Sequence, residues 1–183
     1  MPSRVRSVTL RIRARQGEEN TPLRCGKETL SPDAEDAVLE SLLGNPPENP
    51  GKEDPYTSEL MTAAVAEETE DGRLCLRYRE SELSGMEGTT TEISFSRAEP
   101  TLVTIERTGS VRCVLVLEPG RYHTGTYETP VMPLTVTTHA LRLENSATLE
   151  GGRLETEYLL RIGGITSTRT RLSVEVLARG GNT

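Results

Sequence analysis

The sequence predicts an all-β protein, a single antiparallel up-and-down barrel of about eight to ten strands. Two observations lead to this prediction. Apolar and polar residues alternate with a period of two near the N-terminus and almost without interruption from residue 57 to the end. Turn sequences such as Glu118-Pro119-Gly120 separate stretches that are rich in threonine, which suits a pleated surface. Because each stretch has one apolar face, closure into a barrel is favoured, since it leaves no exposed edge.

Ten stretches have this pattern. We expect strands at residues 5–15, 57–67, 72–80, 89–96, 101–108, 111–118, 121–129, 133–143, 152–162 and 167–177. The stretch 57–67 is ambiguous, because its apolar run would also suit a helix. In 5–15 the arginines would alternatively form a nucleic-acid-binding arm, but Arg11 and Arg13 alternate with apolar residues, which favours the solvated face of a half-buried strand.

Residues 16–56 interrupt the alternation. Ser31-Pro32-Asp33 is typical of a helix N-terminus, and Ala34, Val38 and Leu42 follow at helical spacing before Gly44. We therefore expect one short helix near 32–43 within an acidic, partly flexible insertion. Residues 1–183 would then form a single barrel domain, with this insertion between its first two strands.

The charge of the chain is concentrated in one segment. Residues 16–71 contain fifteen acidic and three basic residues, and the net charge of the whole chain is −7. This charge, together with 3% aromatic residues, argues against a nucleic-acid partner. No apolar run approaches the ~20 residues of a membrane helix, and the basic N-terminus lacks the apolar stretch of a signal peptide. We expect a cytoplasmic protein with neither nucleic acid nor membrane as partner.

The sequence contains no recognisable catalytic or metal-binding motif. Cys25, Cys75 and Cys113 are widely spaced, and His123 and His139 fall on different predicted strands. There is no nucleophile elbow, metalloprotease helix, phosphate loop or dinucleotide-binding motif. We therefore expect no metal and no cofactor, and we assign no catalytic residue.

Several short motifs carry a resemblance to a known family. They are Leu74 to Glu80, with its Tyr-x-Glu element, the loop Gly85-Met86-Glu87-Gly88, Arg107-Thr108-Gly109 and Gly125 to Thr129. Together they resemble the YwiB-like family of small bacterial proteins, over about residues 5–15 and 57–177. The resemblance implies a calycin-like or lipocalin-like β-barrel in the bacterial cytoplasm. It implies no assigned activity, and the 16–56 insertion departs from the compact members of the family.

The alternation places several polar side chains at one end of the barrel. Along successive up and down strands, Glu80 ends one strand, Thr91 begins the next and Arg107 ends the third. A later strand ends at the same rim, which is also the rim at which the insertion begins. We predict a mouth lined by Tyr78, Glu80, Thr91, Arg107, Tyr127 and Thr129.

This mouth has three interpretations. In the first interpretation Glu80 and Arg107 form an inward salt bridge, since a buried charge must be paired, and Thr91 and Tyr127 hydrogen-bond to the two charged groups. Alternatively, Arg107 beneath an apolar wall would bind a small anionic or amphipathic ligand, and the protein would be a non-enzymatic binder. Catalysis at the rim is the third interpretation. A different function, interaction with a protein partner or a second copy, would use the helix near 32–43.

Overall fold

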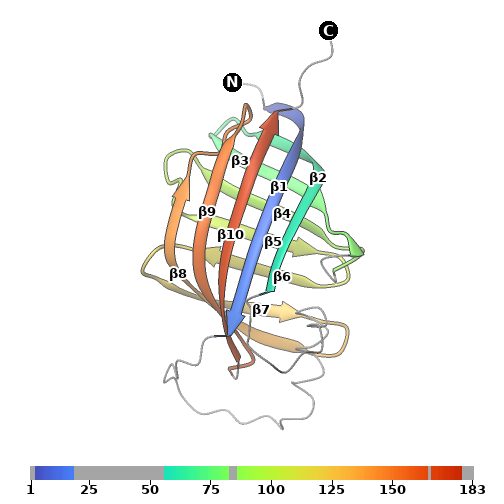
Figure 1. Ribbon diagram of the computed structural model, residues 1–183, viewed down its shortest axis with the longest axis vertical. Coiled ribbons are helices and arrows are strands. Elements are labelled where there is room, and N and C mark those ends of the chain that lie inside the picture. Colours follow the sequence, from blue (N-terminus) through green and yellow to red (C-terminus); the bar gives the residue numbers. More distant parts are fainter. Residues whose placement is uncertain (1–2, 19–55, 83–85, 165, 179–183) are drawn as a thin grey trace.

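The computed structural model describes residues 3–18, 56–82, 86–164 and 166–178. Within these ranges the chain forms ten antiparallel strands that close into a barrel (Figure 1), which confirms the predicted fold class. The strands are β1 (Arg4–Glu18), β2 (Tyr56–Glu68), β3 (Arg73–Arg79), β4 (Thr90–Ser96), β5 (Val103–Thr108), β6 (Arg112–Leu117), β7 (Tyr122–Glu128), β8 (Pro133–Asn145), β9 (Gly152–Ile162) and β10 (Thr166–Ala178).

Each of the ten predicted strands is present, and the ambiguous stretch 57–67 is strand β2. It is a strand because it pairs with β1 along its whole length and buries Ala64 and Ala66 at alternate positions. The predicted helix near 32–43 lies outside the described residues and stays a prediction. No described segment forms a helix long and apolar enough to span a membrane.

Strand β1 closes the barrel. It pairs with β2 from Arg4↔Glu68 to Gln16↔Tyr56, while its other edge pairs with β10. The remaining strands follow as a simple meander, each next to its neighbours in sequence. Figure 1 shows β1 and β10 side by side, with β1 ending at the lower end of the barrel.

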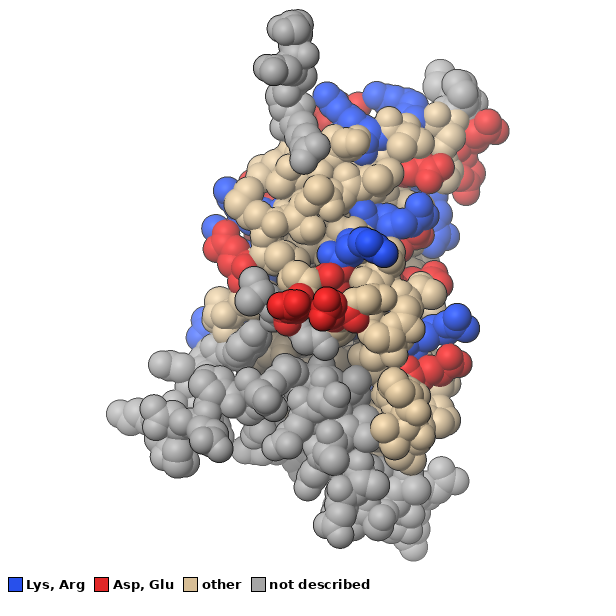
Figure 2. Space-filling model, turned by 90° about the vertical axis from the view of Figure 1, so that its right-hand side faces the viewer, with Lys and Arg blue, Asp and Glu red and all other residues tan. Residues whose placement is uncertain are grey.

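Arg11, Arg13 and Arg15 of β1 lie on the outer face, as the alternation predicts. Arg11 pairs with Glu175 at 3.1 Å, and Arg13 pairs with Glu59 at 3.2 Å. Basic and acidic side chains are likewise interspersed over the face in Figure 2. Exposed pairs of this kind contribute little stability, typically about 0–1 kcal/mol each, so the fold depends on its interior.

The interior is apolar over most of its length and is plugged at the end opposite to the end of β1. Leu10, Leu76 and Leu154 are fully inaccessible to solvent, and each such side chain contributes roughly 1.5–3 kcal/mol. In the loop between β8 and β9, Ala147 and Leu149 fold inward and are buried. These two side chains therefore extend the apolar core to this end of the barrel.

Strands β6 and β7 make the weakest contact in the barrel. They pair in register only at Arg112↔Glu128 and Cys113↔Tyr127. Beyond this point Thr138 of β8 points into the barrel, and its hydroxyl donates to the carbonyl oxygen of Val116 at 2.6 Å. Thr138 therefore satisfies a backbone acceptor on β6 that β7 leaves without a ladder hydrogen bond.

Replacing Thr138 by Val should destabilise the barrel by about 1–3 kcal/mol, because the shape is kept while the partly buried Val116 carbonyl loses its donor. Thermal unfolding measures this, at roughly 2–4 °C per kcal/mol for a domain of this size. Thr137→Val on the outer face of β8 is the matched control, since its hydroxyl is bonded only to an exposed threonine. Equal melting temperatures for the two variants would contradict this role of Thr138.

Candidate ligand-binding site

One row of inward residues runs around the barrel near the end of β1. The strand registers place Tyr78 opposite Thr91, Thr91 opposite Arg107, Arg107 opposite Cys113, and Cys113 opposite Tyr127. Strands β3 to β7 thus contribute one residue each to the row. Side chains far apart in the sequence meet here because an antiparallel ladder puts register partners on the same face.

The row borders a cavity of about 180 Å³ that opens at this end. Its polar lining includes Tyr78, Glu80, Arg107, Tyr127, Tyr158 and Thr170. Its apolar lining includes Ile12, Leu60, Met86, Ile93, Ile105 and Leu160. Five strands, β1, β3, β5, β7 and β9, end around this opening, as expected for strands that run alternately up and down.

Four of the six predicted mouth residues line the cavity: Tyr78, Glu80, Arg107 and Tyr127. Thr91 does not line it but donates its hydroxyl to Glu80 Oε1 at 2.6 Å. Thr129 lies apart from the other five, because β7 ends at Glu128 and the chain turns there. Its hydroxyl donates to the carbonyl of Met132 at 2.8 Å and so holds the turn between β7 and β8.

Glu80 is held in position by the strand ladder and by the following loop. It lies one residue past β3, and its backbone N–H donates to the carbonyl of Thr89 at 2.9 Å, which continues the pairing with β4. The loop then packs against Gly109, whose φ is +142°, and a Cβ on Gly109 would lie 2.2 Å from the Gly88 oxygen. Close packing of the β3–β4 loop at Gly88 against the β5–β6 turn at Gly109 fixes the rim beside Glu80.

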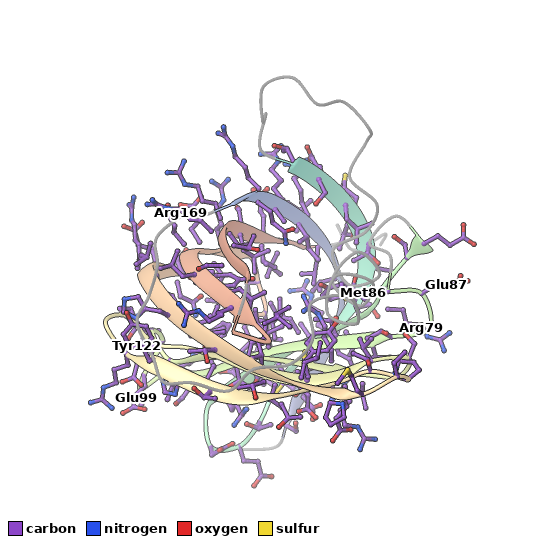
Figure 3. The ribbon with its side chains drawn as sticks, turned by 90° about the horizontal axis from the view of Figure 1, so that it is seen from below. Arg79, Met86, Glu87, Glu99, Tyr122 and Arg169 are labelled. Carbon is purple, nitrogen blue, oxygen red and sulfur yellow. The ribbon has the colours of Figure 1, made fainter. Side chains whose placement is uncertain are left out.

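Met86 lies on the same loop and covers part of the opening. It is partly buried against the core and lines the cavity. Figure 3 views the barrel from below, with Met86 nearer the centre than Arg79 and Glu87, which lie toward the outside. The rim is therefore apolar where Met86 faces the opening and charged on its outer side.

Arg107 is the only cation that reaches the cavity among the described lining residues, and its Nε is buried without a hydrogen-bond partner. It interacts electrostatically with Glu80 but makes no direct ion pair with it. The inward salt bridge, one of the sequence interpretations, is therefore not formed. Thr91 of β4, which lies opposite Arg107 between β3 and β5, donates its hydroxyl to Glu80 instead.

The phenols at the cavity stay protonated near neutral pH. Burial raises the pKa of Tyr78, and the charge of Glu80 raises it further. Burial also raises the pKa of Tyr127 and of Tyr158, although Arg107 opposes the shift in both. Burial alone would lower the pKa of Arg107, but neighbouring groups outweigh it and raise the pKa. The cavity thus combines a guanidinium cation, a carboxyl group and neutral phenol donors.

Tyr158 and Thr170 were not predicted as site residues. They face each other on β9 and β10, and both line the cavity. The alternation in β9 contains the signal, because Tyr158 shares its phase with the buried Leu154 and Thr156. No group of three or more histidine, cysteine or acidic side chains among the described residues could hold a metal ion.

Residues 48–174 match the family model described as "Domain of unknown function (DUF1934)". The match spans more than half of the chain, so the protein belongs to this family of unknown function. The fold is similar to that in the crystal structure of the ywiB protein from Bacillus subtilis, with a TM-score of 0.65 and 13% sequence identity, over 96% of this chain and 94% of that one. No curated protein matched the sequence. The two matches confirm the predicted resemblance to the YwiB-like family and its barrel fold.

The raised pKa values of these phenols make stability depend on alkaline pH. An unfolded chain releases tyrosine protons near pH 10, whereas burial keeps Tyr78, Tyr127 and Tyr158 protonated to higher pH. Their contribution is therefore complete below about pH 10 and is lost as pH rises above it. Urea unfolding measured across this range should show a falling free energy of unfolding.

Tyr78→Phe should flatten that fall, because one of the shifted groups is removed. Tyr122→Phe is the control, since Tyr122 is 56% exposed on the outer face. If the three curves ran parallel, the buried phenols would not be the source of the pH dependence.

Proposed function

We propose that the protein is a non-enzymatic binder of a small anionic or amphipathic ligand in the mouth of the barrel. The observation that carries this proposal is the guanidinium of Arg107, which lines an open cavity and whose buried Nε has no hydrogen-bond partner. A buried donor on a charged group is costly unless it is satisfied. A planar guanidinium is suited to bind a carboxylate or a similar anion through two parallel hydrogen bonds.

The size of the cavity supports a small ligand. At about 180 Å³ it holds the volume of about six water molecules and is smaller than the usual 300–1,000 Å³ of pockets for drug-sized ligands. Its apolar residues, among them Ile93, Ile105 and Leu160, would contact a short hydrocarbon portion. The proposed binder would thus function like a small calycin-like barrel in the bacterial cytoplasm.

Binding is favoured over catalysis by the protonation states of the phenols. General acid–base catalysis works best when the pKa of the group lies near the operating pH. Burial instead moves the pKa of Tyr78, Tyr127 and Tyr158 away from neutrality. These groups are suited to hold a ligand by donating hydrogen bonds.

Native mass spectrometry of gently purified protein, compared with its denatured mass, tests the proposal. We expect a stoichiometric extra mass in the native spectrum that is lost on denaturation. Arg107→Lys should lower the affinity for the bound molecule roughly ten- to a hundredfold, because Lys cannot make the bidentate contact. The fraction of protein that carries the extra mass should fall accordingly. The melting temperature should stay close to that of the wild type.

Arg112→Lys is the matched control, because Arg112 is the exposed arginine at the start of β6. Retention of the extra mass in Arg107→Lys would refute the proposed role of this guanidinium. A monomer with no extra mass would count against binding altogether, and an oligomer with no extra mass would favour the interaction role.

A further inference from the structure

Building on the proposed function, we infer that the ligand is a small zwitterion with the charge pattern of a free aliphatic amino acid. Its carboxylate would bind Arg107, and its ammonium group would bind Glu80. The inference rests on the opposite charges of Glu80 and Arg107, which line one cavity and form no direct ion pair. The other charged lining residue, Glu59, is paired with Arg11 and Arg13 on the outer face.

The first step concerns Glu80, which is 9% exposed and lines the cavity. Its hydrogen-bond donor is the neutral hydroxyl of Thr91, which reaches Oε1 at 2.6 Å. The phenol of Tyr78 adjoins the carboxyl group and is neutral as well. A carboxylate offers about four acceptor positions, so Glu80 can accept further hydrogen bonds from a group inside the cavity.

The second step concerns the selectivity of this arrangement. A simple anion at Arg107 would be attracted by the guanidinium and repelled by Glu80, whose charge acts on the same site. A simple cation at Glu80 would meet the opposite problem. A zwitterion avoids both, because each of its ends meets the opposite charge, and buried charges contribute favourably only when they are paired in this way.

The third step is the geometry of the rest of the cavity. Two strand spacings, roughly 10 Å in all, separate the backbones that carry Glu80 and Arg107. Both side chains line the same cavity of about 180 Å³, in which a short dipolar ligand would contact them both. Ile93 and Ile105 form an apolar wall beside it. Tyr127 and Tyr158 can donate to the ligand's carboxylate, but being neutral they cannot replace either charge.

Calorimetric titration with three probes of matched shape tests the inference. The probes are L-leucine, 4-methylpentanoate, which lacks the ammonium group, and isopentylamine, which lacks the carboxylate. For the wild-type protein we expect L-leucine to bind at least tenfold more tightly than either of the others. This ratio of wild-type affinities tests the zwitterion inference even if a variant at the site fails to fold.

Glu80→Gln should then lower the affinity for L-leucine at least tenfold and leave that for 4-methylpentanoate unchanged or improved. Glu82→Gln is the matched control, because Glu82 is exposed in the same loop. If 4-methylpentanoate bound as tightly as L-leucine and Glu80→Gln changed neither affinity, the zwitterion would be ruled out while the anion-binding function stood. If none of the probes bound while the co-purified mass was still present, the zwitterion would likewise be ruled out and the anion-binding function would stand. If that mass were absent as well, both proposals would fail.

Discussion

The structure depends on the closure of the barrel by β1. This strand pairs with β2 on one edge and with β10 on the other, so both ends of the meander are joined through it. Without it the sheet would have two open edges and an interior exposed to water. Closure also fixes the strand number and the diameter, and these decide whether the interior is packed solid or keeps a cavity.

Because the strands pair in a closed barrel, inward residues at the same level on successive strands become neighbours. Each strand from β3 to β7 supplies one inward residue at the level of Arg107, and the ladder holds them in order. Because Thr91 of β4 lies between Tyr78 and Arg107, the guanidinium is flanked by neutral groups. The carboxyl group of Glu80 lies one step nearer the rim. The two charged side chains thus line one cavity without forming a direct ion pair.

The sequence was sufficient to predict the strands and most of the mouth, because alternation determines which face each residue takes. It could not establish whether Glu80 and Arg107 touch, since that depends on the spacing of two strands separated by a third. Thr129 shares the phase of Tyr127 but falls just past the end of β7, and the boundary of a strand is set by its turn. The alternation in β9 shows that Tyr158 points inward, but its level in the barrel depends on the register of β9 against β10, which no local pattern specifies.

The two ends of the interior differ in a way that stability alone does not explain. At one end Leu149 and Ala147 plug the barrel with apolar side chains, the arrangement that best stabilises a small fold. At the other end a guanidinium and a carboxyl group lie inside without pairing, although apolar residues would fill that space at lower cost. Positions at which a sequence departs from the rules of a well-packed core are expected to be functional sites. This difference within one barrel supports the proposed ligand-binding role of the mouth.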